Sequence, residues 1–188
     1  MMTTQVRSMM QKLLTLDVNL SNRLRMEVDD SFRWKLVAFL AHSGDSWFWL
    51  VGLALAWLLS PSWKGFSAFL MLDILILAAV VMSIKFIVRR SRPPGEWGSI
   101  YRSTDPHSFP SGHAARAMMI ASVVAANAPP WAAVGVVIWA FLVSLSRIFT
   151  GMHYISDVIA GMALGLLSGG IFLAVQGWMV QFLPFLFG

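Results

Sequence analysis

Two histidines in this sequence lie in settings that suit chemistry on a phosphate group. The first, His113, follows Pro110, Ser111 and Gly112 at the start of an apolar run. A helix that begins here presents free N–H groups and a partial positive charge, which together form an anion site. Ser111 could donate to that anion, Gly112 lets the backbone approach it, and His113 can exchange a proton near neutral pH. The alternative is an ordinary helix cap followed by an interfacial histidine.

The second histidine, His153, lies four residues before Asp157 and six after Arg147. Residues four apart face each other on a helix turn. A carboxylate on one ring nitrogen fixes the tautomer and leaves the other nitrogen basic and nucleophilic. Arg147 comes from the end of the preceding helix, across a tight turn at Gly151. The alternative is a purely structural His–Asp pair.

A third cluster, Lys85 to Pro93, supplies cations. Lys85 and Arg92 are seven residues apart, so they share a face if the helix persists that far, and Pro93 then ends it. Two cations that project in the same direction from a helix end would bind a phosphate. The alternative is a basic stop-transfer anchor that follows the positive-inside tendency.

The three clusters together favour phosphoryl transfer through a phosphohistidine, without a metal or other cofactor. Two histidines, one with a carboxylate partner, would lie among Lys85, Arg92 and Arg147. Metal binding is the rival use of two histidines, but strong positive charge and the shortage of accompanying carboxylates disfavour a divalent cation. The absence of cysteine excludes disulfides, thiolate zinc sites and iron–sulfur clusters.

The elements that must position these residues are membrane helices. The chain has 188 residues, of which 57% are hydrophobic and 12% are charged, too apolar for a soluble domain of this size. The net charge of +5 has no soluble basic face to carry it, so no nucleic acid partner is expected. The sequence predicts an all-α transmembrane bundle of about five to six helices, with spans near 46–60, 65–88, 113–128, 131–149 and 157–183.

Residues 1–45 form a separate region, because neither of their two apolar stretches reaches the ~20 residues needed to cross a bilayer. Leucines and methionines alternate with charges at helical spacing, which predicts amphipathic helices lying in the membrane interface. No cleavable signal peptide is expected, and residues 46–188 form the transmembrane core. Five spans would place the N-terminal region, the loop 91–112 and the turn 150–156 on the same side of the membrane.

The motifs resemble the full signature of the type 2 phosphatidic acid phosphatase (PAP2) superfamily: Lys85-x6-Arg92-Pro93, Pro110-Ser111-Gly112-His113 and Ser146-Arg147-x5-His153-x3-Asp157. The resemblance implies that His153 attacks phosphorus while Asp157 orients the imidazole of His153. His113 would protonate the departing group and then activate water. The phosphoryl oxygens would be held by Lys85, Arg92, Ser111, Gly112 and Arg147.

Members with this membrane architecture dephosphorylate lipids, so the resemblance implies phosphatidate, phosphatidylglycerol phosphate, a polyprenyl diphosphate or lipid A as substrate, with membrane lipids as the other partners. The alternatives are a lipid phosphotransferase that uses the same intermediate and a non-catalytic membrane protein on the same fold. The HxxxD box of acyltransferases also matches His153 and Asp157, but it leaves Lys85, Arg92 and Pro110–His113 unexplained. The sequence does not indicate an oligomeric state.

The sequence gives conflicting indications of the side of the membrane on which the site lies. Counting of basic residues places it in the cytoplasm, whereas the family resemblance favours the outer face of the cell membrane, which we prefer.

Polar residues outside the motifs carry further expectations. Arg116 lies one turn below His113 and is expected to face the same cavity, paired with Glu96 or Asp105, or to contact a headgroup. Other possible headgroup contacts are Tyr101, Arg102 and His107. Asp73 lies in mid-span, about 18 Å along the helix from Lys85, so a hydrogen-bonded packing role is expected rather than catalysis.

Overall fold

The computed structural model describes residues 4–94, 105–182 and 184, and within these ranges the regular elements are all helical. They are α1 (Thr4–Leu24), α2 (Phe32–Ser43), α3 (Ser46–Leu59), a 3-10 turn (Pro61–Trp63), α4 (Lys64–Val88), α6 (Gly112–Asn127), α7 (Pro130–Phe149) and α8 (Ile155–Phe182). The all-α prediction is confirmed. Each of the five expected spans corresponds to a helix whose ends differ from the prediction by at most a few residues.

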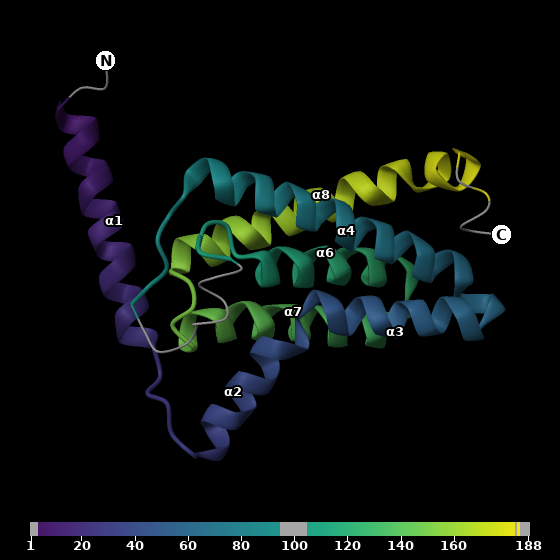
Figure 1. Cartoon of the computed structure of the whole chain (residues 1–188), viewed down its shortest axis with the longest axis horizontal. Helices are drawn as coiled ribbons and strands as arrows, with labels where there is room; N and C mark the ends of the chain where they lie inside the picture. Colours follow the sequence, from purple (N-terminus) through teal and green to yellow (C-terminus); the bar gives the residue numbers. More distant parts are fainter. Residues whose placement is uncertain (1–3, 95–104, 183, 185–188) are drawn as a thin grey trace.

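Among the described residues, three helical segments are long and apolar enough to cross a membrane: Pro61–Val88, which contains α4, then α7 and α8. The pair α2 and α3, bent by 58° at the break between them, meets the same criterion as one broken span. Helix α6 has only 16 residues, yet it runs alongside the longer helices rather than at their edge (Figure 1). The chain is therefore an integral membrane protein, with three or four spans identified by length and composition.

Helix α6 forms the centre of the bundle: nine of its 16 residues are buried, and four of these are alanines. Ala114, Ala115, Ala117 and Ala121 are at most 2% exposed. The small side chains let α8 approach closely, and its glycines at 161, 165 and 169 face α6 at the contact. This contact fixes the start of α6 against the start of α8, where His113 and Asp157 lie.

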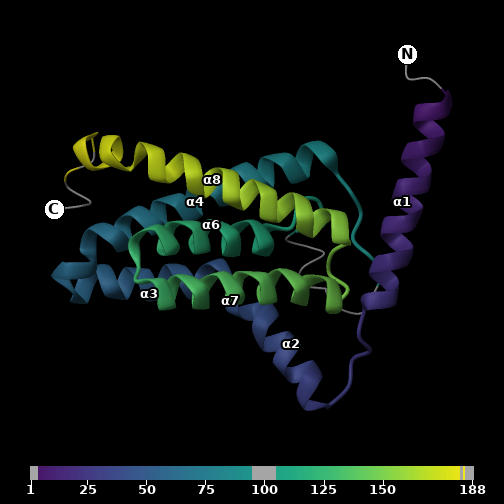
Figure 2. The same cartoon turned by 180° about the vertical axis from the view of Figure 1, so that it is seen from behind.

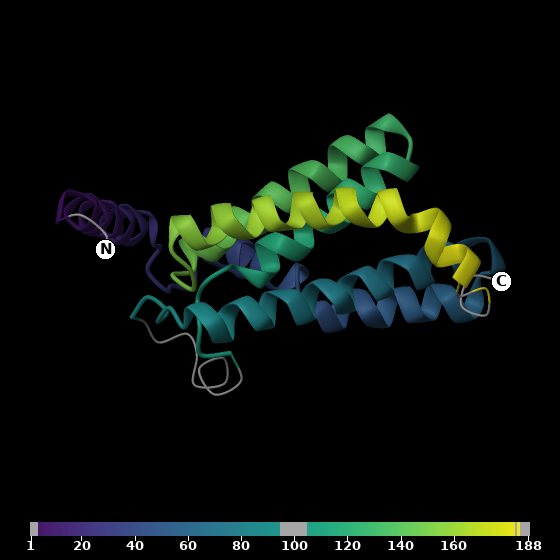
Figure 3. The same ribbon diagram turned by 90° about the horizontal axis from the view of Figure 1, so that it is seen from above.

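The chain segments that carry the polar motifs lie at one end of the bundle. The end of α4, the start of α6 and the connection between α7 and α8 meet there, while the turns at 60–63 and 128–129 lie at the opposite end (Figure 3). Helix α1 lies across this same end, steeply inclined to the other long helices (Figures 1 and 2). The expected gathering of polar chemistry at one face is thus present in the fold.

Candidate active site

The nucleophile candidate lies in the short connection between α7 and α8. Gly151 has a φ of +67°, which a residue with a Cβ adopts only under strain, and this turn reverses the chain. The backbone N–H groups of Met152 and His153 both donate to the carbonyl of Arg147, at 3.2 Å. His153 is therefore fixed by its own loop, directly before the helix turn that carries Asp157.

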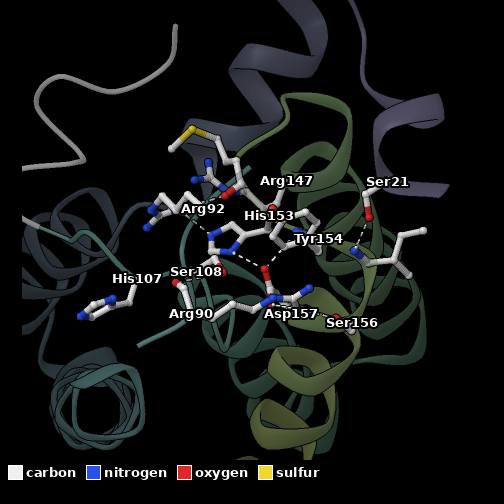
Figure 4. A network of polar contacts seen from close by, with 12 residues as sticks. Ser21, Arg90, Arg92, His107, Ser108, Arg147, His153, Tyr154, Ser156 and Asp157 are labelled. Atoms are coloured by element: carbon white, nitrogen blue, oxygen red, sulfur yellow. Dashed lines mark hydrogen bonds and ion pairs between the residues drawn. The ribbon is translucent and has the colours of Figure 1, made fainter. Parts of the chain in front are cut away.

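The two ring nitrogens of His153 have different neighbours (Figure 4). Nδ1 lies 3.7 Å from Asp157 Oδ2, an ion-pair distance that is longer than a hydrogen bond. Nε2 lies 3.2 Å from Nη1 of Arg92. With its Nδ1 side directed at the carboxylate, the ring presents the lone pair of Nε2 to the cations, as a phosphorus nucleophile requires.

His153 is only 2% exposed, and this burial changes its protonation. Burial, together with the nearby charges of Arg92, Arg147 and Lys85, lowers the pKa of His153 to about 3, against the opposing effect of Asp157. The imidazole is consequently neutral at physiological pH. A neutral ring has the free lone pair that nucleophilic attack needs.

Lys85 and Arg92 converge on one carboxylate oxygen. Lys85 Nζ donates to Asp105 Oδ2 at 2.6 Å, and Arg92 Nη2 donates to the same oxygen at 2.7 Å. Arg92 also donates from Nη1 to the carbonyl of Met152 at 3.1 Å, which ties it to the loop of His153. The two cations are thus spaced to hold a single anionic oxygen, as binding of a phosphoryl group would require.

The start of α6 is attached to the start of α8. The backbone N–H of Ser111 donates to the carbonyl of Asp157 at 2.9 Å. The hydroxyl of Ser111 is buried and, within the described part of the chain, has no hydrogen-bond partner. Ser111 therefore does not cap α6 with its side chain, and it is not among the residues that line the pocket described below.

His113 has a carboxylate partner that sequence reasoning did not find. Its Nε2 lies 2.6 Å from Asp45 Oδ1, and the other oxygen of Asp45 lies 3.2 Å from Nδ1 of His42. Asp45 belongs to the α2–α3 corner, residues 44–46. Gly44 is needed there, because a Cβ would come within 2.8 Å of Val143 and 3.4 Å of the His113 ring.

Arg116 holds this corner in place. Its Nε donates to the carbonyl of Gly44 at 2.9 Å, and its Nη1 donates to the hydroxyl of Ser46. The residue lines the same pocket as His113, and these two hydrogen bonds go to the α2–α3 corner, while Asp105 pairs with Lys85 and Arg92. The suggested partner Glu96 lies outside the described residues.

One pocket of about 400 Å³ brings most of these groups together. Its cationic and imidazole side chains are Lys85, Arg92, His113, Arg116, Arg147 and His153, with Gly112 also on its wall. Its apolar wall is formed mainly by α4, from Met82 back to Ile74. Since Ile74 lies eleven residues before Lys85, this wall reaches about 16 Å from Lys85 toward the middle of the bundle.

The remaining candidates lie elsewhere. The ring of His107 packs edge-on against Phe86, 5.8 Å between centroids, and its backbone carbonyl accepts from Lys85. Tyr101 and Arg102 lie outside the described residues. Asp73 is fully buried, and both of its carboxylate oxygens lack a hydrogen-bond partner among the described residues, so the expected hydrogen-bonded packing role is not what the structure shows.

Comparisons with known proteins agree with this geometry. The model of the PAP2 superfamily matches residues 67–180, which include all three motifs. An undecaprenyl-diphosphatase from Sulfolobus acidocaldarius is 32% identical over 145 residues, covering 75% of this chain and 68% of that protein. A probable lipid phosphate phosphatase beta from Arabidopsis thaliana is 34% identical over 145 residues, covering 62% of this chain and 68% of its own length.

The fold is also shared with a solved structure. The crystal structure of a transmembrane PAP2-type phosphatidylglycerolphosphate phosphatase from Bacillus subtilis superposes with a TM-score of 0.73 at 20% identity, covering 89% of this chain and 88% of that one. The motifs, their convergence on one pocket and the family match over most of the chain agree, and this chain belongs to the PAP2 superfamily.

Proposed function

We propose that this protein is a membrane lipid phosphate phosphatase that works without a metal, through a phosphohistidine on His153. The observation that carries the proposal is the single pocket that joins two histidines and a cluster of cations to an apolar wall. The cations lie at the end of the bundle and the apolar wall leads toward its middle. A lipid phosphate would therefore bind with its phosphate among the cations and its chain along α4.

The reaction would proceed in two displacements. Nε2 of His153 attacks phosphorus, the bond to the lipid oxygen breaks, and His113 gives that oxygen a proton. Water then attacks the phosphohistidine, His113 takes the proton of this water, and the P–N bond breaks to release inorganic phosphate. Lys85, Arg92 and Arg147 stabilise the charge that develops on the phosphoryl oxygens in both steps.

The pocket and the names of the relatives support a proposal for the substrate class. One relative carries the name undecaprenyl-diphosphatase and another the name lipid phosphate phosphatase, so a polyprenyl diphosphate and a phosphatidate-like monoester are the leading candidates. We place the site at the outer face of the cell membrane. Three of the basic residues at this end, Lys85, Arg92 and Arg147, are assigned to the phosphate in this proposal, so they are weak indicators of a cytoplasmic location.

Purified protein in detergent should release phosphate from at least one lipid of a panel that holds phosphatidate, phosphatidylglycerol phosphate, undecaprenyl diphosphate and a lipid A species. Release should persist in EDTA, because the proposed nucleophile and charge stabilisers are side chains. Vanadate should inhibit, since it mimics five-coordinate phosphorus. Glycerol 3-phosphate, which lacks the chain for the apolar wall, is the matched poor substrate. Folded protein that releases no phosphate, or that EDTA inactivates, would contradict the proposal.

Changing Asp45 to asparagine should lower kcat by about 10- to 100-fold, less than the roughly 10²- to 10⁴-fold contribution of an acid–base group such as His113. The amide keeps the shape of the side chain but no longer holds the imidazole by a charge. KM should change little, because Asp45 pairs with His113 rather than with the phosphate cations. Asp30→Asn, at an exposed carboxylate in the N-terminal region, is the control. Equal kcat in the two variants would remove Asp45 from the proposed mechanism.

A further inference from the structure

Helix α1 has two polar residues on its apolar face, where a helix that lies in the membrane interface should have none. At 100° per residue, its apolar side chains form one face, and Asp17 and Ser21 lie near the centre of that face. Ser21 is only 4% exposed, and the side chain of Asp17 only 11%. Large neighbours on the same face are exposed, including Met10, Leu13 and Leu20. The two polar residues therefore have a partner within the protein.

That partner is the first turn of α8. Oδ1 of Asp17 accepts from the backbone N–H of Ser156 at 3.0 Å, and the hydroxyl of Ser21 accepts from the backbone N–H of Ile155 at 2.9 Å. These are N–H groups that a helix cannot satisfy by itself. Helix α1 thus caps, from more than 130 residues away in the sequence, the helix that carries Asp157.

Arg90 extends this contact to the candidate catalytic carboxylate. Its Nη1 donates to Asp157 Oδ1 at 2.6 Å, and its Nη2 donates to Asp17 Oδ2 at 2.7 Å. The guanidinium also stacks on the ring of Tyr154, 4.1 Å from the centroid. A planar guanidinium can bridge two carboxylates in a fixed geometry, which a lysine ammonium cannot.

The bridge from Asp17 through Arg90 ends on Asp157, so it can affect the proposed reaction. Asp157 is fully buried, and burial disfavours a charged carboxylate unless a cation and hydrogen bonds offset it. One of its oxygens faces His153 and the other receives Arg90. A cation that contacts the buried Asp157 is therefore itself held in place by α1.

We propose that Asp17 and Arg90 are positioning residues of the reaction, which hold Asp157 ionised and directed at His153. The inference rests on the proposed function of the site. It gives the N-terminal helix a second role beside the lipid contact that its exposed apolar face indicates. Helix α1 becomes part of the active site through the chain Asp17–Arg90–Asp157, although it contributes no group that touches the substrate.

The proposal is tested with Asp17→Asn, Arg90→Gln and the double variant. Arg90→Gln should lower kcat by about 100-fold and Asp17→Asn by about 10-fold, with KM nearly unchanged, because neither side chain reaches the phosphate. The double variant should be no slower than Arg90→Gln, because Asp17 acts through Arg90. Arg90→Lys should recover only part of kcat. Asp30→Asn is the matched carboxylate control.

The dependence of kcat on pH separates positioning from a merely structural role. Without Arg90, Asp157 loses a charged contact, so the profile of kcat against pH should be displaced in Arg90→Gln, and Arg90→Lys should restore it. The charged or titratable groups around Asp157 are His153, Arg90, Tyr154 and, beyond Arg90, Asp17. A variant that was only less stable would have a lower kcat at every pH, without a shift of the profile along the pH axis.

A measurement that does not depend on turnover separates a failure of the positioning role from a failure of the proposed function. Nitrogen NMR of ¹⁵N-histidine-labelled protein, assigned with His153→Ala, should show a changed His153 signal in Arg90→Gln and Asp17→Asn but not in Asp30→Asn. Turnover by the wild type with unchanged kcat, pH profile and His153 signal in the variants would overturn the positioning role alone. A wild type that releases no phosphate would overturn the proposed function, and the His153 signal would still decide the role of Asp17 and Arg90.

Discussion

Replacing His153 with alanine should abolish lipid phosphate hydrolysis and prevent any covalent phosphoenzyme from forming. The side chain supplies the nucleophile, and the structure keeps it neutral by burial and turns Nε2 toward the phosphate cations. The loss of a nucleophile costs at least about 10⁴-fold in kcat, because only binding and charge stabilisation remain. Phosphate release measures the first effect, and labelling with a ³²P-phosphorylated lipid measures the second.

The other site histidine offers a matched comparison. His113→Asn should also be slow overall, but with a substrate that has a good leaving group it should accumulate labelled phosphoenzyme. Formation of the P–N bond then needs no proton donor, whereas its hydrolysis still needs a base. Labelled phosphoenzyme in His153→Ala would exclude His153 as the nucleophile. If His113→Asn is also unlabelled although it binds vanadate, the covalent route itself is wrong.

The sequence could predict which groups surround the two histidines, because several of these neighbours lie close along the chain. The spacing of His153 and Asp157 on one helix turn, and of Ser111 and Gly112 before His113, is fixed by local geometry. The convergence of these motifs with Lys85 and Arg92 needed only the order of the spans. Apolar run lengths gave that order, with helix ends correct to a few residues.

Asp45 and Asp17 could not be assigned in the same way, because their partners are distant in the sequence. Asp45 meets His113 across 68 residues and Asp17 meets Ser156 across 139. Both depend on how short helices cross the end of the bundle, which periodicity does not define. The sequence does contain a signal for Asp17, since a carboxylate at the centre of an apolar helical face requires a partner inside the protein.

The motifs do not identify Arg90 as a site residue. It lies two residues before Arg92 and outside the motif pattern, so its charge is easily attributed to the positive-inside tendency. Helix α4 ends at Val88, and Arg89 has a φ of 53°, which redirects the chain before Arg90. The expected two-turn face from Lys85 to Arg92 is therefore not helical throughout. The chain instead brings Arg92 to the same carboxylate as Lys85 from beyond the helix end.

The helix that carries Asp157 must also lie close to the helix that carries His113, and this contact depends on Gly165. A Cβ at Gly165 would lie 2.1 Å from the carbonyl oxygen of Ala115, which is backbone and cannot move aside alone. Gly165→Ala should therefore force α6 and α8 apart. Overpacking of this kind costs about 3 kcal/mol, which would lower the unfolding temperature by roughly 10 °C for a chain of this size.

The same helix provides the control for this substitution. A Cβ at Gly170 would meet nothing within 4 Å, so Gly170→Ala should leave activity unchanged and stabilise slightly, because alanine is the better helix former by about 1 kcal/mol. Thermal unfolding and phosphate release of the two variants in the same detergent measure the contrast. In Gly165→Ala the folded protein should also be less active, because separation of the helices strains the hydrogen bond from the Ser111 N–H to the Asp157 carbonyl. Equal behaviour of the two variants would mean that the helices can separate without disturbing the site.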